Sequence, residues 1–176
     1  VRAVELDPAL APAHLRLAVM NARIANQQMD ARRAFRTAQS QRARLTEHDQ
    51  VLLDALVPFF QADPPDLKLC EQRLAHAAER FPEDAEIHYY LAFMRFERGQ
   101  LQASLPAYDR ALAIDPLFAQ AWSQKAAVHL LAGDSAEAAR AVDRCLEISP
   151  SATECMWIRT SSPRPVTAWR VDVLRR

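Results

Sequence analysis

The sequence predicts an all-α fold built from stacked helical hairpins, and three observations lead to this prediction. The two glycines of the chain, Gly99 and Gly133, are 34 residues apart. Pro82, Pro116 and Pro150 recur at the same interval. The chain between these prolines divides into two similar halves, and a fixed period in this range is typical of stacked repeats. Half of the residues are hydrophobic, and strand-type alternation is scarce, which favours helices.

The period from 118 to 152 predicts two antiparallel helices. Gly133 ends the first helix, because glycine adopts the left-handed cap conformation without a Cβ penalty. Asp134 or Ser135 is placed to cap the second helix, and Pro150 closes the unit, since proline cannot continue a helix interior. One stripe of the first helix consists of Trp122, Lys125, Ala126 and His129, and the stripe of the second helix consists of Ala138, Val142 and Cys145.

This pattern resembles the tetratricopeptide repeat, W-x2-L-G-x2-Y…A-x3-F…P. The direct matches are Trp122, Ala138 and Pro150, with Leu91, Ala92, Tyr108, Ala111 and Pro116 in the preceding copy. The departures are Lys125 for leucine, His129 for tyrosine and Ser104 for alanine. The resemblance implies a right-handed α-solenoid of antiparallel helix-turn-helix repeats. It also implies a concave groove, lined by the first helix of each pair, that holds a peptide or a partner helix.

Residues 1–45 contain two units, which are the end of one repeat and a complete repeat. Residues 1–8 match the end of a preceding repeat helix, because AVELDP aligns with the later ALAIDP. Since the chain starts with Val1 inside this pattern, we expect it to be a fragment of a longer protein. Residues 9–45 predict a repeat whose first helix runs from about Pro12 to Ala25. Its second helix carries the stripe Ala31, Phe35 and Ala38.

Residues 46–83 predict a degenerate repeat. Thr46 to Asp49 resembles a capping box. Pro58 removes the hydrogen bond to the carbonyl of Asp54, so a kink or an early helix end is expected. Asp63-Pro64-Pro65-Asp66 replaces the glycine turn, and the second-helix stripe then consists of Cys70, Leu74 and Ala77.

Two regular repeats, 84–117 and 118–152, precede an incomplete unit at 153–176. The sequence ATECMWIRT begins a fifth repeat, and Ser161-Ser162-Pro163-Arg164-Pro165 then breaks the helix. Beyond it, Val166, Trp169 and Val173 predict a short amphipathic helix that does not fit the repeat. We therefore expect an irregular tail.

Composition argues against several classes of partner. Lys+Arg and Asp+Glu are both 22, so no net field favours nucleic acid or an anionic membrane. No apolar run approaches the ~20 residues of a membrane span. Residues 32–44 contain five arginines without an acid, and the absence of interleaved aromatic residues favours a solvated helix face over a phosphate or RNA site. Cys70, Cys145 and Cys155 have no C-x-x-C spacing, which predicts reduced thiols and a cytoplasmic location.

Signatures of catalysis or of cofactor binding were not found. Two glycines 34 residues apart cannot form G-x-x-x-x-G-K, G-x-G-x-x-G or G-x-S-x-G. His14, His88 and His129 occupy slots that the resembled family fills with aromatic residues, so they are interpreted as packing rings. A zinc site formed by His129 with Cys145 and Cys155 has only weak support from the spacing. We predict no enzyme activity, no cofactor and no metal.

The predicted function is a protein–protein interaction module. The predicted groove is mostly apolar, which argues against a carboxylate clamp, and Tyr89, Phe93 and Phe96 are predicted to form an exposed aromatic cluster in it. Two alternatives remain open: a regulatory segment of a bacterial serine/threonine kinase, which the 45–66 region and the 144–159 region resemble, and self-association through uncapped solenoid ends. The groove positions are Leu15, Val19, Phe59, Tyr89, Phe93, Phe96, Ser123, Ala127 and Leu130.

Overall fold

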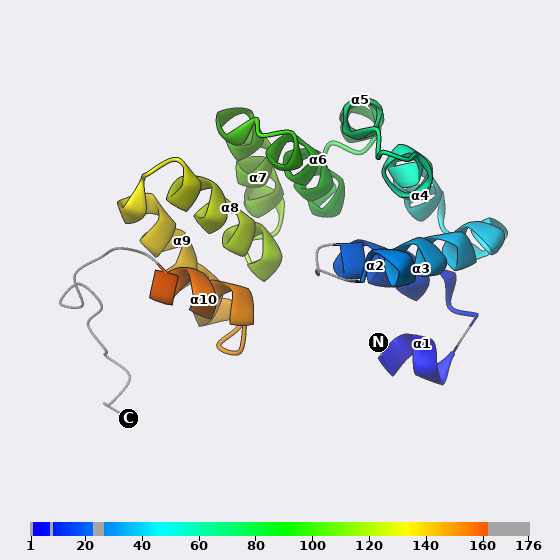
Figure 1. Cartoon of the computed structure of the whole chain (residues 1–176), viewed down its shortest axis with the longest axis horizontal. Coiled ribbons are helices and arrows are strands. Elements are labelled where there is room, and N and C mark those ends of the chain that lie inside the picture. The colour runs from blue at the N-terminus through cyan, green and yellow to red at the C-terminus, as the bar shows by residue number, and fades with distance from the viewer. Residues whose placement is uncertain (1, 8, 23–26, 162–176) are drawn as a thin grey trace.

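The computed structural model describes residues 2–7, 9–22 and 27–161, which contain helices and no strand. The helices follow one another along an arch, with α1 and α10 at its two ends (Figure 1). They are α1 (Arg2–Leu6), α2 (Ala11–Ala22), α3 (Gln28–Ser40), the 3-10 helix η1 (Arg42–Arg44), α4 (Glu47–Gln61), α5 (Leu67–Arg80), α6 (Ala85–Glu97), α7 (Leu101–Ile114), α8 (Ala119–Leu131), α9 (Ser135–Ile148) and α10 (Thr153–Ser161).

The helices pair into hairpins, α2 with α3, α4 with α5, α6 with α7 and α8 with α9, and these are the tightest contacts between elements. The first helices also approach one another directly, since α8 contacts both α6 and α10. The predicted all-α helical repeat solenoid is confirmed.

The two glycine turns have the same geometry. Gly99 and Gly133 have positive φ angles of 73° and 83°. After each glycine, the next backbone N–H donates to a carbonyl five residues earlier, from Gln100 to Arg95 at 2.9 Å and from Asp134 to His129 at 2.8 Å. This hydrogen bond defines the Schellman helix end, which favours glycine because of its left-handed residue. Asp134 then caps α9, as predicted, by accepting from the Glu137 N–H at 3.1 Å.

Departures from the repeat pattern have structural explanations. The Trp122 ring Nε1 donates to the carbonyl of Pro116 at 2.9 Å, and His88, at the equivalent position, places Nε2 3.0 Å from the carbonyl of Pro82. Because a carbonyl only accepts, His88 Nε2 carries the proton and substitutes for the indole. Lys125 pairs with Asp109 at 2.6 Å and lies over the Trp122 ring.

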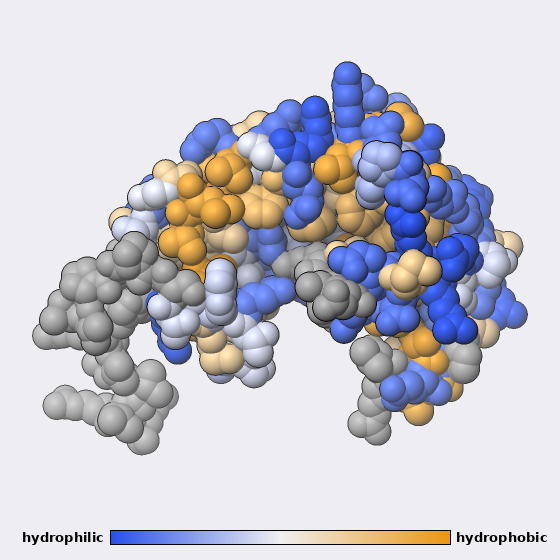
Figure 2. Space-filling model, in the orientation of Figure 1, coloured by the Kyte–Doolittle hydropathy of each residue, from blue (hydrophilic) through white to orange (hydrophobic). Residues whose placement is uncertain are grey.

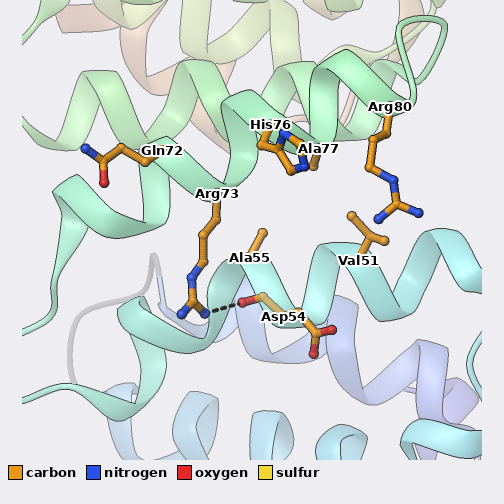
Figure 3. Close-up of a pocket in the computed structure, with 8 residues that line it drawn as sticks. All are labelled: Val51, Asp54, Ala55, Gln72, Arg73, His76, Ala77 and Arg80. Atoms are coloured by element: carbon orange, nitrogen blue, oxygen red, sulfur yellow. Dashed lines mark hydrogen bonds between the residues drawn. The ribbon is translucent and has the colours of Figure 1, made fainter.

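The degenerate repeat corrects one prediction. α4 continues through Pro58 as far as Gln61, so the expectation of an early end is wrong. Proline has no N–H to give to the carbonyl of Asp54, and Arg73 of α5 supplies the missing donor, with Nη1 2.9 Å from that oxygen (Figure 3). The guanidinium replaces the lost helical hydrogen bond.

The start of α4 is only partly a capping box. Thr46 caps the helix, as predicted, by accepting from the Asp49 N–H at 3.1 Å. The Asp49 carboxylate instead pairs with Arg16 of α2. This carboxylate therefore binds a side chain of a neighbouring repeat and not the backbone at the start of α4.

Basic residues between 32 and 44 connect α3 and η1 to their neighbours. Arg42 forms an ion pair with Asp54 at 2.7 Å, Arg32 donates to the carbonyl of Ala62, and Arg44 donates to that of Ala9. The predicted end of the first helix at Ala25 and the predicted tail beyond Ser161 lie outside the described residues.

Candidate functional site: the surface along the first helices

The nine predicted groove residues lie on α2, α4, α6 and α8, and the structure divides them by burial. Leu15, Val19, Tyr89, Phe93 and Ser123 are buried, whereas the remaining four are half-buried. The half-buried positions are Phe59, Phe96, Ala127 and Leu130. The structure does not bring all nine residues onto one open surface.

The expectation of an exposed aromatic cluster on α6 is wrong. Tyr89 and Phe93 are only 4% and 5% exposed. The Tyr89 ring lies 4.9 Å from the ring of Phe118, the residue that precedes α8, and 6.0 Å from that of Tyr108 on α7. The next hairpin therefore covers this face of α6. Phe96, at the end of the helix, remains half-buried.

A charge network connects the first helices of three hairpins. The guanidinium of Arg16 on α2 lies 2.5 Å from carboxylate oxygens of both Asp49 on α4 and Glu86 on α6. Burial would lower the pKa of Arg16, but the two carboxylates outweigh it and raise the pKa. His48 extends the network, with Nε2 2.8 Å from Asp84 Oδ2.

This network also contains, among the described residues, a group of three side chains that could hold a metal ion. Possible ligand atoms of His48, Asp49 and Glu86 lie within 4.8 Å of one another. The Arg16 guanidinium already pairs with both carboxylates, and a metal ion there would meet a fixed positive charge. The arrangement fits an inter-repeat clamp better than a metal centre.

Two hollows involve the first helices. The smaller, of about 140 Å³, lies between α2, α6 and the start of α8, and Val19 and Tyr89 are among its walls. The larger, of about 420 Å³, lies between α8 and α10. Figure 2 shows apolar residues gathered over α8 and the hollow of the arch between its two ends. The larger hollow is lined by Ser123, Gln124, Ala127, Thr153, Glu154, Trp157 and Ile158.

Trp157 is the aromatic residue among the five residues of this pocket that the sequence analysis missed. Its side chain is 66% exposed, although a large aromatic residue is costly to leave in water. Trp157 lies one period of 34 residues after Ser123, a predicted groove position. Extending the groove register into the incomplete repeat would have identified it. Ser123 and Ala127 are the predicted positions that the structure brings to the same pocket.

A third hollow, of about 360 Å³, separates α4 from α5 (Figure 3). Arg73 and Arg80 line it together with Asp54. These charges already have partners within the chain: Arg73 donates to the carbonyl of Asp54, Arg80 pairs with Glu47, and Asp54 pairs with Arg42. We interpret this cleft as structural.

The cysteines also differ from the prediction. Cys145 of α9 and Cys155 of α10 form a disulfide, with their Cα atoms 6.5 Å apart. The prediction of reduced thiols is therefore wrong for this pair, as is the weak zinc alternative that used both sulfurs. Cys70 is a buried free thiol, and burial raises its pKa to about 12.

The fold and this surface define an α-solenoid whose stacked hairpins present their first helices along one side. The tetratricopeptide repeat family matches residues 71–117 and 95–153, which cover the regular hairpins. Residues 71–153 of the chain are therefore tetratricopeptide repeats.

Solved structures agree with this fold. YrrB, a TPR protein with an unusual peptide-binding site, is 20% identical; the alignment covers 90% of this chain and 78% of YrrB, with a TM-score of 0.57. MamA is 17% identical over 87% of this chain and 86% of its own, with a TM-score of 0.55. A tetratricopeptide repeat protein from Parabacteroides merdae is 13% identical over 85% of this chain and 57% of its own, with a TM-score of 0.56. No curated protein matches the sequence.

Proposed function

We propose that this chain is a protein-interaction scaffold that holds a peptide or helix of another protein along its first helices. The observation that carries the proposal is the pocket of about 420 Å³ between α8 and α10, with Trp157 66% exposed beside it. Exposed aromatic residues beside an apolar hollow are typical of interface anchors.

The chemistry of the pocket favours an apolar side chain of the partner. Ala127 and Ile158 contribute aliphatic walls, and Trp157 offers a broad ring face. Ser123 and Gln124 are buried polar residues on α8, and Ser123 Oγ lies 3.4 Å from a carboxylate oxygen of Glu154. The exposed polar residues of the pocket, Thr153 and Glu154, suit the backbone of a bound segment, while the apolar walls suit its anchoring side chain.

Family context supports the proposal. Tetratricopeptide repeat proteins bind other proteins or peptides and are generally not enzymes. Among the described residues, no helix combines the length and apolar character needed to cross a membrane. The kinase-segment and self-association alternatives, and the cytoplasmic location, stay predictions.

The test is selection from a random peptide library on the intact chain, followed by titration of the selected peptide. Trp157→Ala should weaken its binding by roughly tenfold or more, the loss typical of an interface anchor. Met29→Ala is the matched control, because Met29 is 70% exposed but lies on α3, away from the pocket. Equal affinities of the two variants, both with native helical signal, would contradict the proposal.

A further inference from the structure

The disulfide joins two helices of different hairpins at the end of the arch. Cys145 belongs to α9, the second helix of the last complete hairpin, and Cys155 belongs to α10. Both cysteines are 0% exposed and lie in a small core cluster with Ala126, Val142 and Ile158. The disulfide therefore lies within the buried cluster that packs α10 against α8 and α9.

Apart from this bond, α10 is weakly attached. It spans nine residues, Thr153–Ser161, and a helix of this length is marginal in water without packing. Its buried side chains in the described residues are Cys155 and Ile158. The regular first helices α6 and α8 span thirteen residues each and bury more of their side chains. The disulfide thus supplies a large share of what keeps α10 in place.

The same helix forms one wall of the pocket. α10 contributes Thr153, Glu154, Trp157 and Ile158, and α8 contributes the opposite wall. If α10 leaves, the remaining residues of α8 no longer enclose a hollow. We infer that the peptide pocket is under redox control: the Cys145–Cys155 disulfide holds α10 in place and the pocket formed, and its reduction releases α10 and abolishes the pocket. The binding part of this inference rests on the proposed function.

The chemical step is thiol–disulfide exchange with a dithiol reductant. A thiolate of the dithiol attacks one protein sulfur, breaks the S–S bond and forms a mixed disulfide, and the other cysteine leaves as a thiolate that takes up a proton. The second thiol of the dithiol then closes a cyclic disulfide and releases the remaining cysteine. The protein gains two electrons and two protons, and the dithiol loses them. Local opening of α10 gives access to the buried sulfurs.

The third cysteine does not interfere with this pair. Cys70 lies in α5, in the other core cluster, and is 0% exposed. Burial is the main cause of its raised pKa, about 12. The thiol therefore keeps its proton and is a poor nucleophile for exchange. The pair therefore acts as a self-contained two-cysteine unit.

Amide hydrogen exchange of α10 tests, without any ligand, whether the disulfide holds this helix in place. The intact chain carrying Cys70→Ala is compared before and after treatment with dithiothreitol, and the double variant Cys145→Ala/Cys155→Ala is measured in parallel. Alkylation and intact mass establish the redox state. We expect amide exchange within 153–161 to accelerate by more than about tenfold on reduction and in the double variant. Exchange within α6 should stay unchanged.

Unchanged protection of α10 in both the reduced chain and the double variant would overturn the inference, whatever the chain binds. The peptide selected on the oxidised chain provides the second readout, and reduction should weaken its binding by at least about tenfold. A released α10 with unchanged peptide affinity would overturn the redox control of binding. Failure of the proposed function has a different signature, because Trp157→Ala then leaves the peptide affinity of the oxidised chain unchanged. The exchange experiment still shows whether the disulfide holds α10 in place.

Discussion

The two regular hairpins, α6/α7 and α8/α9, and the irregular hairpin α4/α5 reach the same architecture by different means. In the regular hairpins a glycine with positive φ makes the turn, and in α6/α7, where α7 contains Pro106, the Arg95 guanidinium of α6 donates to the carbonyl of Ala103 in α7. In α4/α5 the turn is Asp63-Pro64-Pro65-Asp66, and Pro58 leaves a carbonyl that Arg73 must satisfy from the other helix. The hairpins thus differ in how the turn is made, whereas a guanidinium-to-carbonyl contact between the two helices occurs in both α4/α5 and α6/α7.

This difference extends to the junctions between hairpins. α6 and α8 are joined by apolar packing, with the Tyr89 ring against Phe118. Around α4 the junctions are more polar, since Arg16 bridges Asp49 and Glu86, although the stacked rings of Phe35 and Phe60, 4.4 Å apart, also contribute. Charged bridges are specific in geometry and contribute less than apolar burial, so we expect the stack to be weakest around α4.

The largest effect is expected where the regular hairpins bury their aromatic residues. Phe93→Asp should destabilise the chain by more than about 4 kcal/mol, because it removes a buried ring and places a carboxylate in the core. Trp157→Asp, at an exposed position of α10, should change stability by less than about 0.5 kcal/mol. Urea denaturation followed by circular dichroism measures both. A folded Phe93→Asp chain of near-native stability would show that the ring is not core.

The glycine turns provide the next largest effect. Gly133→Ala should cost about 1–2 kcal/mol, because the left-handed conformation strains a residue with a Cβ. An added Cβ would meet no atom within 4 Å, so the backbone is the whole cause. Gly133→Asn should cost less, since asparagine tolerates this conformation. Equal stability of the alanine variant and the native chain in denaturant titrations would argue against the positive φ.

A smaller effect is expected from the guanidinium that compensates for Pro58. Arg73→Met should cost about 0.5–1.5 kcal/mol, because the carbonyl of Asp54 loses its donor. Pro58→Ala restores a helical N–H for that carbonyl, so the loss should shrink when Arg73→Met is made in this background. Lys68→Met, which removes another exposed base of α5, is the control. A double-mutant cycle in urea measures the coupling, and additive losses would contradict this role of Arg73.

The smallest effect is a gain. Gln100 precedes α7 without a side-chain hydrogen bond to the helix, whereas Asp66 caps α5 by accepting from the Leu69 N–H at 2.9 Å. Gln100→Asp should therefore stabilise the chain by about 0.5–1 kcal/mol, and Asp66→Ala should destabilise it by about 1 kcal/mol. Thermal melting of the two variants measures both shifts. A lower melting temperature for Gln100→Asp would show that its backbone geometry does not admit a cap.

The candidate site was only partly predictable. The groove register identified Ser123 and Ala127, because the 34-residue period fixes which side of a first helix they occupy. The register did not show that Tyr89 and Phe93 are covered by the next hairpin. The side of α6 that carries them also faces α8 and Phe118. How much of a ring is covered depends on the approach of α8 and on Phe118, and no local pattern encodes that distance.

The sequence by itself determined the features that depend on local conformational preferences: the helices, the glycine turns, the aspartate cap of α9 and the repeat period. Only the tertiary structure decided the features that join residues distant in sequence. Arg73 reaches the carbonyl of Asp54, Arg16 bridges two carboxylates of other hairpins, and Cys145 meets Cys155. The physical reason is that helix propensity, capping and turn preferences act within one helix or one turn. Partners of this kind are instead set by how the stacked helices are placed relative to one another.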